Sequence, residues 1–340
     1  MTLDAAVAFF MVISVNFLYD SHMNPLCVIG VSLGLTVVAN AELEFSPIPN
    51  DAPDGFSEVF SKHVDVLGLH VYAKQHVPNS RVLHCANILA QWIDNNEDGE
   101  VDNVFVHQEL VNRHASMVMW WNEDQAEDDF DNIPDDVLDN YGLQALFGDE
   151  VNMGYPNNQE FDATLEETFH LVTHEGYSRV FPDTWGEYQG TAMTNTMDAV
   201  IKGGWYHYDD PTCDYECDAT EYFYWSLTSI LGAQDYPWRI WEIADEWELP
   251  TLALMQKHNQ AMVALLHDNQ WGLATILPDG TYEPSLNSPA DFNGSGFVDA
   301  SDLLFIIDRW GESGEGDLND SGYIDAGDVL TLIDAWGLCS

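Results

Sequence analysis

Basic residues are scarce in this sequence of 340 residues, which has 9 Lys and Arg against 58 Asp and Glu and a formal net charge of −49. A surface this acidic repels nucleic acids and anionic membranes, and it attracts divalent cations. The composition therefore argues against a nucleic-acid partner and favours metal ions or a saline medium as the reason for the charge. Apolar residues still make up 46% of the chain, which excludes a wholly disordered protein.

Long hydrophobic runs are also lacking. The two apolar segments near the N-terminus, Ala5–Leu18 and Cys27–Ala39, are each short for a membrane-spanning helix. The second ends in Ala39-Asn40-Ala41, a small-x-small pattern typical of signal-peptide cleavage. We expect residues 1–41 to be a cleaved signal peptide, with Met23 as an alternative start. The mature protein would then be secreted or attached to the cell surface, without a stable membrane span.

Cysteine is rare, with five residues in the chain. Four of them would remain after signal cleavage: Cys85, Cys213, Cys217 and Cys339. Export permits disulfides, and four cysteines allow three pairings. The short spacing favours a local bridge between Cys213 and Cys217.

The segment Thr164–His174 contains the residues that suggest metal binding. At 3.6 residues per turn, Glu166, His170 and His174 share one face of a helix, and Glu167 flanks them. Thr164 and Glu167 match a capping box, which predicts a helix start just before them. Two histidines four apart can bind one ion, and zinc favours nitrogen and oxygen ligands. The pattern therefore predicts a zinc site or, alternatively, a polar helix face without an ion.

A third ligand would come from another part of the chain. Glu221 is the candidate because it lies in the first turn of a predicted helix, and Glu216 is the alternative. Two histidines, a glutamate and an open fourth position can activate water at zinc, with Glu166 or Glu167 as base or further ligand. Paired histidines followed by a later glutamate are similar to a gluzincin metallopeptidase. That resemblance implies a zinc-dependent hydrolase.

A second acidic segment, residues 94–102, matches an EF-hand-type calcium loop. Oxygen ligands fall at positions 1, 3, 5, 7 and 9, and Gly99 lies at the turn. The ligands are Asp94, Asn96, Asp98, Glu100 and Asp102. Position 12 is Phe105, so the bidentate carboxylate of a full loop is missing. The segment is either a weaker calcium site or an acidic turn without an ion.

The C-terminal region contains an internal duplication, because Asp291–Gly311 and Asp317–Gly337 align without a gap. Each copy places oxygen ligands at positions 1, 3, 5, 7, 9 and 12 of a calcium loop, the ligand at position 7 being a backbone carbonyl. The first copy supplies Asp291, Asn293, Ser295, Phe297, Asp299 and Asp302. The second supplies Asp317, Asn319, Ser321, Tyr323, Asp325 and Asp328. Two such loops in register predict two bound calcium ions.

Residues 291–337 resemble a dockerin, the duplicated loop-helix module that folds on two calcium ions and binds a cohesin. The closing Trp336-Gly-Leu-Cys339 is similar to the tails of planctomycete-type secreted proteins. The resemblance implies an all-α calcium module at 291–340, joined by a linker at 286–290. It also implies a cohesin-like or cell-surface anchoring partner.

Helical patterns dominate residues 42–285, so we expect a fold that is mainly α with minor β: a large helical domain followed by the small all-α calcium module. Strand signal is confined to Val64–Ala73, and Asn122–Asp139 reads as an acidic loop. Helices are expected over Arg81–Ile93, Val104–Trp121, Thr191–Ile201, a segment ending near Leu231, Arg239–Leu249 and Thr251–His267.

Three functions fit these features. The leading hypothesis is a secreted, peptidase-like zinc-dependent hydrolase that carries a dockerin-like calcium-binding tag. A carbohydrate-active enzyme with paired carboxylates would suit the same tag. The third alternative is a non-catalytic, calcium-dependent surface or scaffold-binding protein, which needs only the calcium loops.

Overall fold

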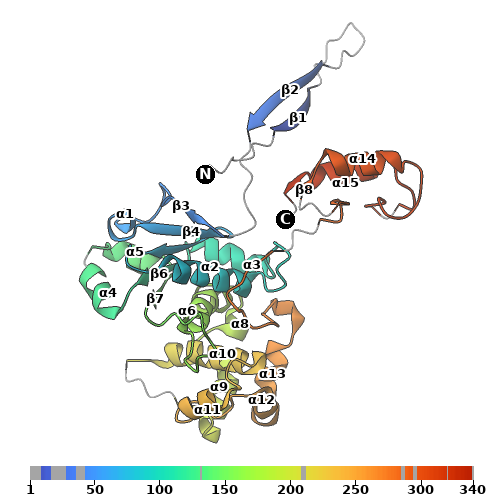
Figure 1. Ribbon diagram of the computed structural model, residues 1–340. Helices are drawn as coiled ribbons and strands as arrows, with labels where there is room; N and C mark the ends of the chain where they lie inside the picture. The colour runs from blue at the N-terminus through green and yellow to red at the C-terminus, as the bar shows by residue number, and fades with distance from the viewer. Residues whose placement is uncertain are drawn as a thin grey trace. The chain divides into compact units, whose positions relative to one another are not determined.

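The computed structural model describes residues 9–16, 28–35, 43–130, 132–207, 212–284, 288–293, 297–319 and 321–338. The chain divides into one compact unit, Glu42–Ser285, and a second that combines Met1–Ala41 with Leu286–Ser340 (Figure 1). In the predicted signal peptide, β1 (Phe9–Asn16) and β2 (Val28–Leu35) pair antiparallel, and Met23 lies outside the described residues. Among the described helices, none is both long and apolar enough to cross a membrane.

The large unit is built around a five-stranded mixed sheet with the strand order β3-β4-β5-β6-β7. Neighbouring strands are antiparallel from β3 to β5 and parallel from β5 to β7. The strands are β3 (Phe45–Ser46), β4 (Lys62–Val66), β5 (Leu69–Ala73), β6 (Ser116–Trp120) and β7 (Leu143–Phe147).

Both faces of the sheet are covered, which explains why the inner strand β6 has no alternation of buried and exposed residues. Met117 and Met119 of β6 point into the main core, whereas Val118 and Trp120 point into a smaller core on the opposite face. All five residues of β6 are buried. A strand buried on both faces reads as a continuous apolar run, which period-2 analysis cannot tell from a buried helix.

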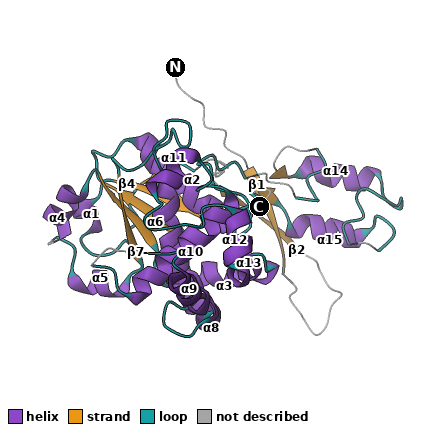
Figure 2. Cartoon of the chain, turned by 90° about the horizontal axis from the view of Figure 1, so that it is seen from below, coloured by secondary structure: helices purple, strands orange, loops and turns teal. Residues whose placement is uncertain are grey.

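Helices lie on both sides of this sheet (Figures 1 and 2). The smaller core is closed by α1 (Phe56–Val59), α4 (Glu123–Phe130) and α5 (Asp135–Asn140). The main core is closed by α2 (Asn79–Ile93), α3 (Val104–Asn112) and α6 (Ala163–Val172). The remaining helices of the unit are the π-helical turn η1 (Thr173–Tyr177), α7 (Ser178–Val180), α8 (Pro182–Trp185), α9 (Ala192–Gly203), α10 (Tyr215–Leu231), α11 (Pro237–Glu242), α12 (Leu252–His258), α13 (Gln260–Leu266) and the 3₁₀ turn η2 (Asn269–Trp271).

The expected fold class, mainly α with minor β, is therefore wrong, because a five-stranded mixed sheet makes the large unit an α/β structure. The helix expected over Val104–Trp121 ends at Asn112, and the chain then enters β6. The single strand expected over Val64–Ala73 is a hairpin, β4 and β5, which turns at Leu67 and Gly68 with positive φ at both. The acidic segment 122–139 contains helices rather than an extended loop.

The described residues of the C-terminal region form two short helices and one strand pair. Helix α14 (Ala300–Asp308) and helix α15 (Ala326–Asp334) each follow one acidic loop, and β8 (Phe297–Val298) pairs antiparallel with β9 (Gly337–Leu338). The expectation of an all-α module is wrong on account of this pair. A small core of Val298, Ile306, Ile324 and Leu332 joins the two halves of the duplication.

Candidate metal centre

Helix α6 begins at a buried acidic cap. The Asp162 side chain accepts a hydrogen bond from the Thr164 backbone N–H, so the N-cap precedes the capping box that Thr164 and Glu167 suggested. The second Asp162 carboxylate oxygen lies 2.6 Å from His84 Nε2 on α2. Because Asp162 and His84 are both buried, this pair fixes the first turn of α6 against α2.

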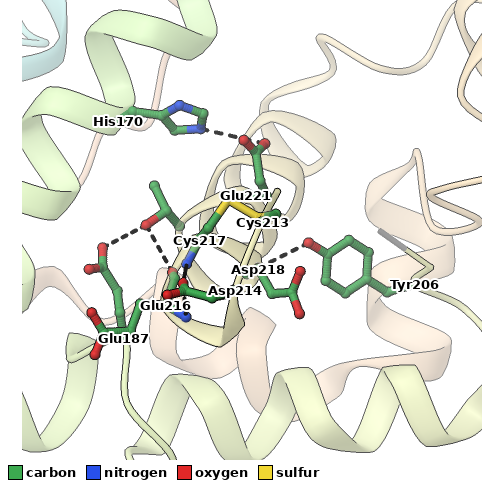
Figure 3. Close-up of a disulfide and its surroundings, with 10 residues drawn as sticks. His170, Glu187, Tyr206, Cys213, Asp214, Glu216, Cys217, Asp218 and Glu221 are labelled. Atoms are coloured by element: carbon green, nitrogen blue, oxygen red, sulfur yellow. Dashed lines mark hydrogen bonds and ion pairs between the residues drawn. A yellow bond between two sulfur atoms is a disulfide. The ribbon is translucent and has the colours of Figure 1, made fainter. Parts of the chain in front are cut away.

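Three side chains converge between α6 and α10. Glu166 and His170 lie one turn apart on α6, and Glu221 reaches them from α10. His170 Nε2 is 3.6 Å from Glu221 Oε2, as Figure 3 shows. One ligand atom from each of the three residues lies within 4.8 Å of the other two. This spacing suits a single cation held by one nitrogen and two oxygens.

Two atoms of this group are buried without a hydrogen-bond partner. They are His170 Nε2 and Glu221 Oε2, and the two residues are only 6% and 9% exposed. Buried polar atoms in folded proteins almost always have a partner. A cation between the two atoms would satisfy both, so the donor set fits a metal ion.

Without an ion, burial and repulsion from neighbouring carboxylates disfavour the ionised forms of both Glu166 and Glu221. Burial and the neighbouring Glu221 raise the pKa of Glu166 to about 8, and burial raises the pKa of Glu221 as well. Burial also opposes a charge on His170, but the carboxylates around it, Glu221 foremost, outweigh that effect and raise its pKa to about 10. In the absence of a cation, bound protons on Glu166 and His170 therefore compensate the negative charge of the carboxylates.

Glu167 lies beside this group and lines a pocket of about 650 Å³. Its Oε2 accepts a hydrogen bond of 2.6 Å from Gln144 Nε2 on β7 and lies 3.7 Å from His170 Nδ1. Glu167 directly follows Glu166, the first of the two candidate ligands on α6, and His170 comes three residues later. In the H-E-x-x-H motif the glutamate that acts as base has the same place relative to its two ligands.

The structure separates His174 from the three converging residues. The helix changes from α to π geometry at Thr173–Tyr177, so the regular stacking of His170 and His174 expected from a 3.6-residue period does not occur. His174 Nδ1 instead lies 2.7 Å from Glu187 Oε2. The site predicted from two histidines and Glu221 is thus rearranged, with Glu166 in the place that His174 was expected to fill.

A pocket of about 650 Å³ opens onto these residues. One wall is apolar and comes from β6, β7 and the α5 region, and includes Trp120, Tyr141 and Leu143. The opposite wall is polar and is lined by Glu167, His170, His174, Glu175, Asp214, Glu216, Thr220 and Glu221. The candidate metal centre is therefore open to a ligand that has both apolar and polar groups.

The wall from α10 is held by its N-terminal turn. The Asp214 side chain caps the helix by accepting from the backbone N–H groups of Glu216 and Cys217, so the helix begins earlier than its sequence indicated. The local disulfide between Cys213 and Cys217 is confirmed (Figure 3). Cys85 is a buried free thiol, and Cys339 lies outside the described residues. Glu216, the alternative ligand, is exposed at the rim rather than beside His170.

The loop 94–102 has the hydrogen bonds of the predicted calcium loops. Asp94 accepts from the backbone N–H groups of Asp98 and Gly99, and Asn96 accepts from Asp98. The backbone N–H of Asn95, at position 2, donates to Asp102 Oδ2 at 2.7 Å. Glu100 is exposed, and its backbone N–H donates to Asp98.

The second C-terminal loop repeats this arrangement. Asp317 accepts from the backbone N–H groups of Ser321 and Gly322, and Asn319 accepts from Ser321. Its position-2 donor, the Leu318 N–H, bonds to Asp328 at position 12. In the loop 94–102, Asp102 at position 9 accepts the corresponding hydrogen bond. Asp102 thus takes the acceptor role of the missing position-12 carboxylate, where this loop has the exposed Phe105.

The first C-terminal loop is described in part. Asp302 accepts from the backbone N–H groups of Phe292 and Asp299, and Asp299 caps α14 as Asp325 caps α15. Asp302 and Asp328 are fully buried. Asp291 and Asn293 lie at the start of the loop, Phe297 belongs to β8, Tyr323 is exposed, and Ser295 lies outside the described residues.

A strap of residues 274–283 crosses the loop 94–102 and the end of α2. Asn95 Oδ1 accepts from the backbone N–H groups of Thr275 and Ile276. Gln91 Oε1 accepts from those of Asp279 and Gly280. The Tyr282 hydroxyl donates to Asp94 Oδ2 at 2.6 Å. The strap is thereby fastened to the residue at position 1 of the loop.

The sequence did not indicate Glu187, Thr220 or Gln144, which support the pocket. Glu187 lies between two helices in an irregular segment, where no periodicity relates it to His174. Gln144 lies on β7, a strand that the sequence did not predict. No protein family model, no curated protein and no solved structure matches this chain.

Proposed function

We propose that the large unit is a metal-dependent hydrolase in which Glu166, His170 and Glu221 hold one divalent cation. The observation that carries the proposal is that His170 Nε2 and Glu221 Oε2 are buried 3.6 Å apart beside a pocket, and that neither has a hydrogen-bond partner. Zn²⁺ is the favoured ion because one imidazole and two carboxylates leave a fourth tetrahedral position for water.

Glu167 is the proposed general base. A cation at this site would lower the pKa of a bound water. Glu167 lies next to the ligand Glu166, is oriented by Gln144, and faces the pocket in which that water would lie. Accepting the water proton requires only a carboxylate within hydrogen-bond reach. The mixed apolar and polar walls suit a peptide-like substrate, so peptidase activity is the specific form of the proposal.

Calcium binding is proposed for the loops at 94–102, 291–302 and 317–328. The support is the set of equivalent backbone hydrogen bonds in the first and third loops, together with the duplication of the second and third. The C-terminal region would then serve as a dockerin-like tag on a secreted enzyme, with a cohesin-like or cell-surface partner. The tag alone would also suit a carbohydrate-active enzyme or a non-catalytic binding protein.

Metal analysis tests the hydrolase proposal. The full chain, purified without chelator and re-loaded with zinc, should contain one zinc per large unit. His170→Ala should lose it, because the variant removes the nitrogen ligand. His267→Gln is the matched control, since His267 is exposed and bonds to the Val263 carbonyl of its own helix. Failure of the wild type to bind zinc, or equal zinc in His170→Ala, would end the proposal.

Cleavage of a mixed peptide library separates the enzyme from the alternatives. The zinc-loaded wild type should release new peptide N-termini, whereas Glu167→Gln should retain zinc and lose most of the rate. Release of reducing sugar from polysaccharides without peptide cleavage would favour the carbohydrate-active alternative. Absence of both activities in the zinc-loaded protein would favour the non-catalytic one.

A further inference from the structure

His174 lies at the same pocket as the candidate metal centre but belongs to a different set of hydrogen bonds. It is placed there by the π-helical turn that follows α6. Turns of this kind are rare in proteins and occur frequently at functional sites. The His174 side chain is 46% exposed and lines the polar wall of the pocket with His170 and Thr220.

The Nδ1 side of the His174 ring is held by the buried carboxylate of Glu187. Its Nδ1 lies 2.7 Å from Glu187 Oε2, and the other oxygen of Glu187 accepts a 2.8 Å hydrogen bond from Thr220 Oγ1. Glu187 is only 8% exposed. Thr220 immediately precedes the proposed ligand Glu221, so the chain Thr220–Glu187–His174 is anchored on α10, the helix that carries Glu221.

The outward nitrogen of His174 is available to a ligand. Its Nε2 lies 3.7 Å from Glu175 Oε1, which is beyond hydrogen-bond distance. The other oxygen of Glu175 is already paired with Arg113 and Arg179, at 3.0 Å from each Nε. Glu175 therefore supplies negative charge near His174 without occupying its Nε2.

The charged groups around His174 favour its protonated form. The hydrogen bond that His174 Nδ1 donates to Glu187 raises the pKa of His174, and the charges of Glu187 and Glu175 act in the same direction. Burial and the nearby Arg179 oppose the shift but do not cancel it. A protonated imidazole fixed through Nδ1 presents one N–H in a set direction, as is required of a group that stabilises developing negative charge.

We propose that His174, oriented by Glu187, donates a hydrogen bond from Nε2 to the carbonyl oxygen of a substrate bound at the metal centre. This inference rests on the proposed hydrolase function. It defines the substrate class as compounds with a polarisable carbonyl, amides or esters, whose carbonyl oxygen lies between the cation site and His174. His174 is then a catalytic residue, and Glu187 is a positioning residue.

The reaction balances without another reactant. The oxygen of water bonds to the carbonyl carbon, the electron pair of the C=O bond moves to the carbonyl oxygen, and the water proton goes to Glu167. The hydrogen bond from His174 strengthens as that oxygen becomes negative. When the C–N bond of an amide breaks, the electron pair returns to the carbonyl, and Glu167 gives its proton to the leaving nitrogen. His174 ends the cycle unchanged.

The test compares zinc-loaded full-length wild type with His174→Gln, Glu187→Gln and the control His267→Gln. The substrate is the peptide that the wild type cleaves best in the library. Zinc content should stay at one per unit in all four proteins. Removing one donor to a developing oxyanion typically lowers kcat by about 10²–10³-fold, and we expect such a loss in His174→Gln, with a much smaller change in KM.

Glu187→Gln gives a second readout that a merely structural role would not change. Loss of the Glu187 charge lowers the pKa of His174, so the alkaline limb of the kcat–pH profile should move to lower pH. Wild-type kcat in His174→Gln overturns the proposal, and so does loss of zinc in that variant, which would make His174 a ligand. An unmoved alkaline limb in Glu187→Gln overturns the positioning role. A wild type that binds no zinc or cleaves no peptide overturns the hydrolase function itself, and this inference with it.

Discussion

Replacing Glu166 by glutamine should stabilise the metal-free protein at alkaline pH, although Glu166 is a proposed ligand. The pKa of this carboxyl rises from 4.5 to about 8 in the folded protein. The folded state therefore keeps a proton that the unfolded chain has lost, and stability must fall as the pH rises between these values. His170, with its pKa raised from 6.5 to about 10, adds a decline of the same sign between those two pH values.

The size of the effect follows from the shift. One pKa unit corresponds to about 1.4 kcal/mol, so Glu166 should make the wild type lose about 3 kcal/mol of unfolding free energy between pH 5.5 and pH 8. Glu166→Gln removes this titration, so the stability of the variant should decline less over this range, with the contribution of His170 remaining. At pH 8 without metal, the variant should therefore be more stable than the wild type.

Urea unfolding of chelator-treated, dialysed protein measures the difference, with the fluorescence of the 12 Trp residues as the signal. Glu58→Gln is the control, because Glu58 is exposed on α1 on the other side of the sheet. Added zinc should reverse the order at pH 8, since a ligand that binds only the folded wild type raises its stability by mass action. A Glu166→Gln variant less stable than wild type in metal-free buffer at pH 8 would refute the reasoning.

Two further outcomes are expected. Asp162→Ala removes both the N-cap of α6 and the buried partner of His84. It should lower the free energy of unfolding by about 3 kcal/mol or more in the same urea assay. A decrease under about 1 kcal/mol would show that the pair does not fix α6. EDTA should abolish the helical circular dichroism of an isolated 286–340 fragment, because its small core cannot fold alone. An unchanged spectrum would contradict this.

The sequence predicted the residues of the candidate metal centre better than the fold around it. Helical spacing predicted that Glu166 and His170 share one face of a helix, and in the structure Glu221 of α10 comes close to both. The position of His174 was predicted wrongly, because the spacing argument assumes a regular α-helix. No sequence pattern that we used predicts the π geometry at Thr173–Tyr177.

The sheet was missed for a different reason. Strands β6 and β7 are five residues each, and β6 is buried on both faces, so it lacks the alternation that identifies a strand. Met117 and Met119 are compatible with a helix that continues from α3. The parallel pairing of β5 with β6 and of β6 with β7 is non-local, and tertiary contacts override local preference in such strands.

The strap of residues 274–283 gives the molecule a defined response to mechanical load. If the C-terminal region is tethered, tension enters the large unit from the strap side, because the chain leaves that unit just beyond Glu283. The first bonds to be loaded are those of Glu283 with Glu97 and of Tyr282 with Asp94, and the bonds to Gln91 and Asn95 follow along the strap. An ion in the loop 94–102 would stiffen this anchorage, so the force needed to detach the strap would depend on calcium. The strap would detach at a lower force than the one that unfolds the pocket.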